Sequence, residues 1–133
     1  MPLRQREHRR KRVRVLESWL LILYVDVVMR FRGFPRFYAL IRERQIRTVT
    51  GYENPNALSH AVDLACVFYF KPVRCLQRSA ALVLLLSHHG WKGDMVIGAQ
   101  LLPALFHGWV EVEGMVLNDK PYVTEMFQVL ERC

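Results

Sequence analysis

The spacing of apolar residues constrains the fold of this chain most, because it changes along the chain from a helical period to a strand pattern. After Val13, apolar side chains recur at steps of three and four residues, as they do on one face of a helix. These residues are Leu16, Trp19, Leu20, Leu23 and Val27. Gly33 and Pro35 then interrupt the helix, and a second one is expected over residues 36–47.

Two further helices and a group of strands are expected in the rest of the chain. A loop ends near Ser59, which would cap a third helix, and a strongly apolar helix follows over residues 75–89. Three later segments have the character of strands: residues 95–101, 106–112 and 115–119. Helices first and an antiparallel sheet last describe an α+β domain.

The positive charge is confined to one end of the chain. The net charge is +7, but seven of the 19 Lys and Arg residues lie in the first 14 positions, which leaves 12 basic and 11 acidic side chains in residues 15–133. We therefore expect residues 1–12 to form a disordered basic arm. Residues 13–133 are expected to form one domain, with a helical part over 13–50 and a core over 60–133. Its nearly neutral body does not favour binding to nucleic acid.

Neither a membrane protein nor a secreted one is expected. The apolar stretch over residues 13–29 is interrupted by Arg14, Glu17 and Asp26, so it falls short of the roughly 20 apolar residues that span a bilayer. Membrane contact through the basic arm is not expected either. The three cysteines form an odd count without the spacing of a disulfide framework, which favours a reducing, cytoplasmic location.

One of the three cysteines is placed for chemistry. Cys66 lies in an apolar helical run, where a thiol usually fills the core, and Cys133 ends the chain. Cys75 opens a helix, where the helix dipole favours a thiolate and where Arg74 and Arg78 lie nearby. Cys75 is therefore the candidate nucleophile, with a core or capping role as the alternative.

His107 is the candidate base. It lies at the start of the strand expected over residues 106–112, whereas the other four histidines lie in the basic arm, at a helix start or at a helix end. A cysteine at a helix start and a histidine on an adjacent strand form the arrangement used for thiolate–imidazolium pairs.

The hairpin that follows His107 supplies a third candidate. With a three-residue loop over residues 112–114, His107 faces Asp119, whose carboxylate would orient the imidazole. With a two-residue loop the register shifts, and Asn118 shares the face of His107 instead. A structural polar cluster is the alternative to a catalytic triad of Cys75, His107 and Asp119.

These residues belong to a longer series of motifs: Cys75-Leu76-Gln77-Arg78-Ser79, His89-Gly90-Trp91, Val96-Ile97-Gly98, Phe106-His107-Gly108-Trp109-Val110-Glu111-Val112 and Asn118-Asp119. Over residues 62–121 the series resembles the transglutaminase-like leader peptidases of lasso-peptide biosynthesis, the family of the microcin-processing B proteins. Gly108 is a departure, since the family usually has alanine at that position.

The resemblance implies a papain/transglutaminase-like core and a cysteine protease that removes the leader of a lasso-peptide precursor, without a metal or a cofactor. A macrolactam synthetase would then close the ring on the freed amine. Because 133 residues leave no room for a fused recognition domain, a separate precursor-recognition protein is expected as a further partner. A transglutaminase-like acyltransferase and a basic, non-enzymatic binding module are the alternative functions.

Further residues are candidates for supporting roles. The backbone N–H of Cys75 would donate to the oxyanion, with Gln100 either as a second donor or as a plain strand residue. Trp109 would shield the contact between His107 and Asp119, or serve only as a core residue. The partner would dock on the N-terminal helices, unless these only cover the core. The residues expected at that surface are Trp19, Leu20, Arg36, Arg42 and Arg44.

Overall fold

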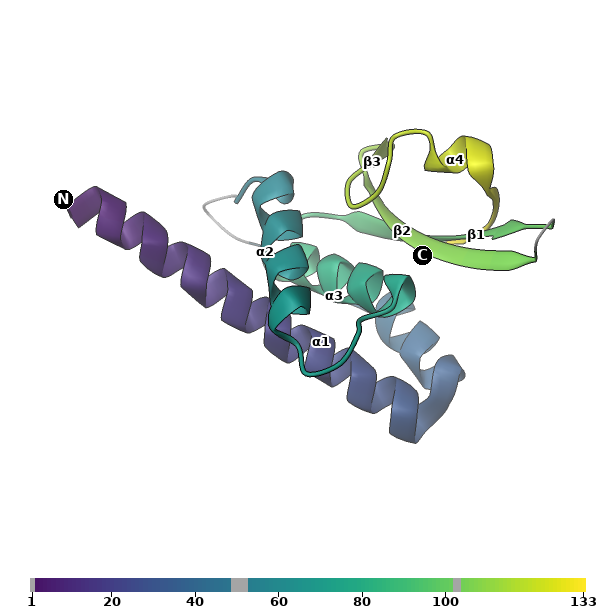
Figure 1. Ribbon diagram of the computed structural model, residues 1–133, viewed down its shortest axis with the longest axis horizontal. Helices are drawn as coiled ribbons and strands as arrows, with labels where there is room; N and C mark the ends of the chain where they lie inside the picture. The colour runs from purple at the N-terminus through teal and green to yellow at the C-terminus, as the bar shows by residue number, and fades with distance from the viewer. Residues whose placement is uncertain (1, 49–52, 102–103) are drawn as a thin grey trace.

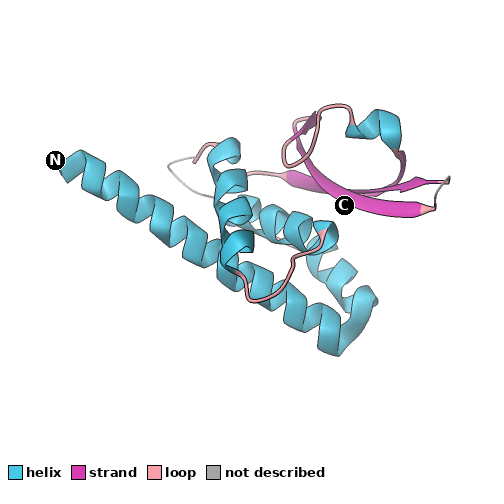
Figure 2. Ribbon diagram, in the orientation of Figure 1, coloured by secondary structure: helices cyan, strands magenta, loops and turns pink. Residues whose placement is uncertain are grey.

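The computed structural model describes residues 2–48, 53–101 and 104–133, and it has the α+β architecture that the sequence predicted (Figure 1). Three long helices come first: α1 (Pro2–Arg42), α2 (Pro55–Phe68) and α3 (Cys75–His88). They are followed by β1 (Gly93–Gln100), β2 (Leu105–Val112), β3 (Met115–Val116), the short helix α4 (Val123–Met126) and β4 (Gln128–Arg132). Figure 2 shows the three long helices on one side of the sheet and α4 on the other.

Helix α3 forms the centre of the helical layer. Its residues 79–87 are all buried, because α1 and α2 pack against it on one side and β1 and β2 on the other. A helix covered on several sides needs apolar residues around most of its circumference, which explains the composition of this segment. The main core joins all the layers: Val25, Phe37 and Ile41 of α1, Leu58 and Val62 of α2, Leu82 and Leu85 of α3, and Val110 of β2.

Helix α1 is interrupted at Gly33, as the sequence predicted. Gly33 has φ +77° and ψ 177°, a conformation that a residue with a Cβ rarely adopts. The chain turns back at this point (Figure 1), so Phe37 and Ile41 reach the core and are fully buried. This second helical piece ends at Arg42, earlier than the predicted end at residue 47.

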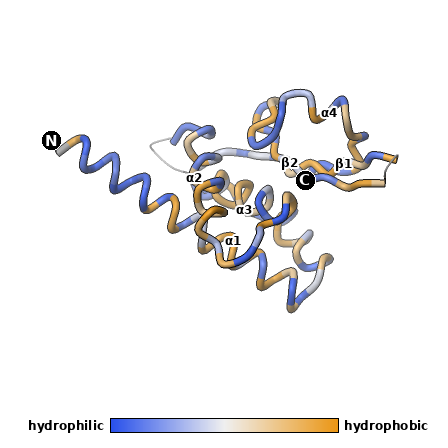
Figure 3. Tube along the Cα trace, in the orientation of Figure 1, coloured by the Kyte–Doolittle hydropathy of each residue, from blue (hydrophilic) through white to orange (hydrophobic). Residues whose placement is uncertain are grey.

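The prediction of a disordered basic arm is wrong, because residues 2–12 continue α1 as helix. Figure 1 shows this end of α1 projecting beyond α2, and Figure 3 shows that hydrophilic residues dominate it. Arginine, glutamine, glutamate and lysine all have high helix propensity, and Glu7 pairs with Lys11 one turn later at 3.6 Å. Such residues extend a helix that packing has already nucleated further along.

Helix α2 begins earlier than predicted. Asn54 caps it by accepting a hydrogen bond from the Asn56 N–H (2.8 Å), and Pro55 occupies the first turn, where no N–H is needed. Ser59, the predicted cap, is buried inside the helix. Helix α3 begins at Cys75, as the sequence predicted, and Gly90 with φ +85° follows its end.

The four strands form an antiparallel sheet in the order β3-β2-β1-β4. Gly98 of β1 lies opposite His107 of β2. Strand β4, which the sequence did not predict, pairs with the other edge of β1 and has a register shift next to Gly98. His107 therefore lies on a central strand, and the segment before β4, which includes α4, crosses the face of the sheet opposite the long helices (Figure 1).

The hairpin between β2 and β3 has a different register from the one predicted with a three-residue loop. Its loop has two residues, Glu113 and Gly114, whose φ angles are +53° and +78°. Two positive φ angles give the turn that best matches the twist of paired strands. Glu111 consequently pairs with Val116 rather than with Met115, and the predicted three-residue loop is wrong.

Candidate active site

Cys75 lies at the N-terminus of α3, and its side chain is partly buried. The first turn of this helix packs on β2 beside His107. The Ser79 hydroxyl donates to the Gly108 carbonyl (3.1 Å), and a Cβ added to Gly108 would lie 3.3 Å from Cδ1 of Leu76. The helix end that carries Cys75 is thus in direct contact with the strand that carries His107.

The structure brings His107 and Asp119 together. Nε2 of His107 contacts Oδ2 of Asp119, and Oδ1 of Asp119 accepts a hydrogen bond from the Lys120 N–H (2.7 Å). The His107 side chain is 25% exposed and the Asp119 side chain 16%, so the pair is largely shielded from water. In the part of the chain that the structure describes, no hydrogen bond joins the Cys75 thiol to this pair.

Asp119 reaches His107 by a route that differs from the predicted one. The two-residue loop moves the hairpin register by one residue, but regular pairing continues only as far as the Leu117 N–H, which donates to the Val110 carbonyl (2.8 Å). The chain then bends at residues 118–119. This bend, and not strand pairing, returns the carboxylate to His107.

Asn118 links α3, which carries Cys75, to β2, which carries His107. Its Oδ1 accepts from the Val110 N–H (2.8 Å), and its Nδ2 donates to the Ser79 hydroxyl (3.1 Å). Arg78 donates to the Asn118 carbonyl (3.3 Å). Asn118 is thus bonded to β2 and α3 rather than to His107, so its geometry fits a structural link better than an orienting partner for the imidazole.

Two aromatic rings hold the imidazole of His107. Its ring stacks on Phe127 with centroids 5.1 Å apart, and Trp109 lies 6.0 Å away in a tilted arrangement. Phe127 joins α4 to β4, in a region where the sequence analysis assigned no element. No periodicity linked Phe127 to His107 in the sequence, so this neighbour was missed.

Trp109, Glu111 and Arg132 form a series of hydrogen bonds next to His107. Trp109 is fully buried, and its Nε1 donates to Oε2 of Glu111 (2.8 Å). Glu111 is only 5% exposed, and its other oxygen accepts from Nη1 of Arg132 on β4 (2.6 Å). A buried carboxylate needs a paired charge and hydrogen bonds, and these two residues supply both. Trp109 is therefore fixed in orientation beside His107.

The segment that leads to Cys75 is anchored on α1 by Asp26, which is 8% exposed. The Asp26 carboxylate accepts from the Tyr69 hydroxyl (2.9 Å), from Nζ of Lys71 (2.8 Å) and from Nε2 of Gln77 (3.0 Å). Gln77 in turn accepts from the backbone N–H of Arg74, just before Cys75 (3.3 Å). We refer to Asp26, Tyr69, Lys71 and Gln77 as the Asp26 cluster.

The Asp26 cluster predicts a pH-dependent contribution to stability. Burial alone would raise the pKa of Asp26, but the hydrogen bonds from Lys71, Tyr69 and Gln77 and the Lys71 charge lower it below the ordinary 3.8. The contribution is therefore complete above about pH 5 and is lost as the pH falls through 3.8 towards the lowered pKa. Asp26→Asn should reduce the free energy of unfolding by about 1–3 kcal/mol at pH 7, as measured by urea denaturation.

The matched control for this prediction is Asp63→Asn. Asp63 has a half-exposed side chain and only a 4.0 Å contact with Arg78, so its replacement should change stability little. The difference between the wild-type chain and the Asp26 variant should shrink as the pH is lowered. An equal difference at every pH would contradict the role given to the carboxylate charge.

Gln100 ends β1, two residues beyond Gly98, and is partly buried. Its strand partner is Leu105, so it lies beyond the position opposite His107. A role for Gln100 as an oxyanion donor stays a prediction.

The residues expected at a docking surface differ in their surroundings. Arg36 and Arg42 are exposed, and Leu20 is 52% exposed. Arg44, in contrast, donates to the Ile41 carbonyl (2.7 Å) and to the carbonyl of Gly93 at the start of β1, and burial lowers its pKa. Arg44 thus ties the end of α1 to the sheet, which does not fit a docking role.

Residues 2–48, 53–101 and 104–133 contain no group of three or more His, Cys, Asp or Glu side chains arranged to hold a metal ion. Over the same ranges, none of the helices has the length and apolar character needed to cross a bilayer.

Comparison with known proteins gives two matches. The model of the family described as Transglutaminase-like superfamily matches residues 21–132. The chain is also 30% identical over 97 residues to the Microcin J25-processing protein McjB of Escherichia coli, a match that covers 71% of this chain and 41% of that protein. The chain thus spans less than half the length of this relative. No solved structure matches the chain. Since the family match includes α2, α3 and the whole four-stranded sheet, the chain belongs to the transglutaminase-like superfamily.

Proposed function

We propose that this chain is a cysteine protease that removes the leader peptide from a lasso-peptide precursor, with Cys75, His107 and Asp119 as its catalytic triad. The observation that carries the proposal is the contact of Asp119 with His107 on β2, the strand against which the first turn of the Cys75 helix packs. The relative from Escherichia coli is named for the processing of microcin J25, which supports the choice of substrate class.

The proposed reaction is acyl transfer to the thiol and then to water. Because Asp119 holds Nε2 of His107, the other ring nitrogen, Nδ1, takes the thiol proton. The Cys75 thiolate attacks the last carbonyl of the leader, and His107 returns the proton to the leaving amine of the core peptide. Water then attacks the thioester, which releases the leader as a carboxylic acid and restores the thiol.

The N-terminus of α3 supplies the electrostatic part of this mechanism. The backbone N–H of Cys75 belongs to the first turn, where helix amides have no partner within the helix, and it would donate to the oxyanion. Gln100 is the proposed second donor. The Phe127 and Trp109 rings would keep the imidazole in one orientation throughout.

The cleavage would be one step of a longer maturation. A separate recognition protein would hold the leader and raise its effective concentration at Cys75. The free amine of the core is the group that a macrolactam synthetase would then join to an acidic side chain. Neither the cleavage nor the delivery step calls for a metal or a cofactor.

The test is incubation of the chain with a lasso-peptide precursor and its recognition protein, followed by mass spectrometry. We expect a leader fragment with a free carboxylate and a core fragment with a free amine. Cys75→Ala should abolish both fragments, and Cys66→Ala should not. A leader joined to an added amine would instead support an acyltransferase, and products that persist in Cys75→Ala would overturn the assignment of the nucleophile.

A further inference from the structure

A groove of about 600 Å³ lies between the first half of α1 and the second half of α2, with none of the candidate catalytic residues in its lining. The side chains from α1 are His8, Lys11, Arg12, Val15, Leu16 and Trp19, and those from α2 are Leu64 and Phe68. Trp19 fixes the spacing of the two helices, because its Nε1 donates to the Phe68 carbonyl (3.3 Å) and its ring packs on Tyr69 at 5.5 Å.

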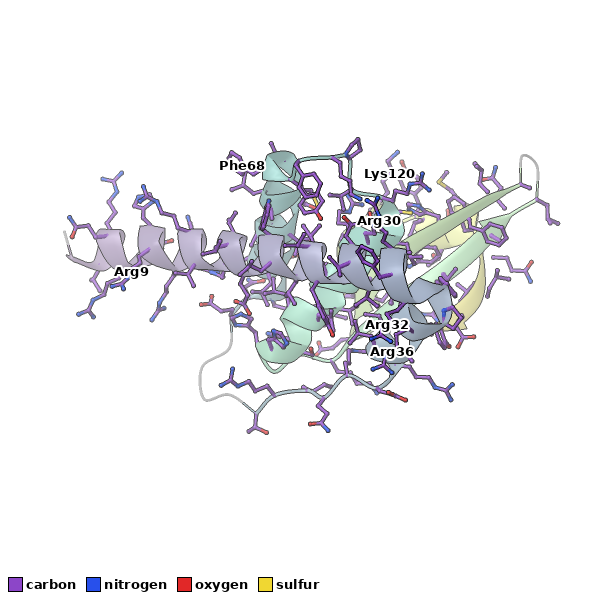
Figure 4. The ribbon with its side chains drawn as sticks, turned by 90° about the horizontal axis from the view of Figure 1, so that it is seen from below. Arg9, Arg30, Arg32, Arg36, Phe68 and Lys120 are labelled. Atoms are coloured by element: carbon purple, nitrogen blue, oxygen red, sulfur yellow. The ribbon has the colours of Figure 1, made fainter. Side chains whose placement is uncertain are left out.

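The apolar part of this groove is unusually exposed. Leu16 is 60% exposed, Leu64 47% and Phe68 68%, and Val67 and Phe70 beside them are 75% and 70% exposed. Figure 4 shows Phe68 at the outer end of α2, directed away from the core. Isolated exposed apolar residues are normal, but a contiguous group of this kind marks an interaction surface.

The rim of the groove is basic. His8, Lys11 and Arg12 stand along one side, on the projecting part of α1, and no described residue of the lining is acidic. Lys11 has an ion-pair contact with Glu7 at 3.6 Å, but both side chains are more than 60% exposed, so the pair competes weakly with another anion. The occupant that complements this surface has an apolar row flanked by acidic side chains.

We propose that the groove binds an amphipathic, acidic segment of a partner protein. Its concave form favours such a segment over a membrane, because the partly buried Trp19 lies between two helices where a flat bilayer makes poor contact. A helix placed along the groove would instead insert its apolar side chains between Leu16 and Phe68. The site is independent of the triad, and it replaces the surface around Arg36, Arg42 and Arg44 as the docking surface.

The test uses two labelled helical peptides of about 18 residues, or five turns. Both have leucines at three- and four-residue steps, and glutamates flank the leucines in one peptide while lysines flank them in the other. Fluorescence anisotropy with the full chain should show about tenfold or tighter binding of the glutamate peptide. Leu16→Ser and Phe68→Ser should each weaken it about tenfold. Lys11→Glu together with Arg12→Glu should reverse the preference between the peptides.

Matched variants elsewhere on the surface serve as controls. Met115→Ser replaces an apolar residue of the hairpin that is 74% exposed, and Arg36→Glu with Arg42→Glu reverses two exposed charges on the other piece of α1; neither change should alter binding. Circular dichroism should show that every variant keeps its helices. Equal affinity for the two peptides, loss of binding in the controls, or binding only to vesicles of anionic lipid would each overturn the proposal.

Discussion

Replacement of His107 by alanine should lower the rate of leader cleavage by about 10³- to 10⁴-fold, to a residual rate set by substrate binding and the proposed oxyanion donors. The reason is the loss of the group that takes the Cys75 proton and returns it to the leaving amine. Cys75→Ala should be at least as damaging. Because the two residues act as a unit, the double variant should be little slower than either single one, as measured by timed mass spectrometry of the fragments.

The remaining members of the site give this prediction its controls. Asp119→Ala should lower turnover but leave more activity than His107→Ala, because the imidazole keeps its reactive nitrogen and loses only its orientation. Asn118→Ala should mainly reduce stability, because it removes the links from Asn118 to Val110 and Ser79. A larger loss of turnover in a stable Asn118 variant would contradict the assignment of roles.

The proposed roles of Cys75 and His107 also predict which thiol reacts first with an alkylating agent. Iodoacetamide at neutral pH should modify Cys75 first, because burial raises the pKa of the Cys66 and Cys133 thiols and disfavours their thiolates. His107→Ala should slow the labelling of Cys75 and leave the other two unchanged, as followed by peptide mapping. Preferential labelling of Cys66 would remove the basis for Cys75 as the nucleophile.

Gly98→Ala should be the most damaging conservative change outside the triad. A Cβ at Gly98 would lie 2.8 Å from the Phe127 Cβ and 2.8 Å from the ring of Trp109, the two residues that hold His107. Trp109 is fully buried and bonded to Glu111, so it has no room to retreat. We expect a loss of about 1–3 kcal/mol in the free energy of unfolding, together with about a 100-fold loss of turnover.

Gly108→Ala is the matched control, since it makes the same change on the neighbouring strand. A Cβ there would meet the flexible end of Leu76 at 3.3 Å, which a small rotation relieves, and would lie at ordinary contact distance from the Leu76 Cα (3.5 Å) and the Val96 carbonyl oxygen (3.8 Å). Urea denaturation and the cleavage assay should therefore show a small effect. If Gly98→Ala were equally mild, the aromatic contacts around His107 would not fix its position.

The sequence predicted the candidate site better than the path of the chain around it. The apolar run that begins at Cys75 and the Gly90 stop signal after it predicted α3 correctly, with Cys75 at its start, because both signals are local. The hairpin loop was ambiguous between two and three residues, and a shift of one residue changes every partner in a strand. His107 and Asp119 meet all the same, because the bend at residues 118–119 depends on bonds to Ser79 and Arg78, far away in the sequence.

Other features depended on contacts that no local pattern contains. Strand β4 and Phe127 follow a short helix, and their positions are set by pairing with β1. Arg44 had the composition of a surface cation, but it lies against the Gly93 carbonyl across the core. The basic N-terminal segment was misjudged from its charge, although its residues favour helix.

The Asp26 cluster determines which parts of this chain unfold together. Asp26 belongs to α1, but its three partners belong to the segment that ends α2 and begins α3. Val25, Phe37 and Ile41 of α1 also share one core with α3 and β2. Separation of α1 from the rest would break the contacts of the Asp26 carboxylate with its three partners and open that core, so the two parts form a single cooperative unit. Local opening near Cys75 therefore costs nearly as much free energy as global unfolding, and the Arg78 amide, which donates to the Arg74 carbonyl (3.0 Å) at the start of α3, should exchange with solvent deuterium about as slowly as the amides at the helix centre.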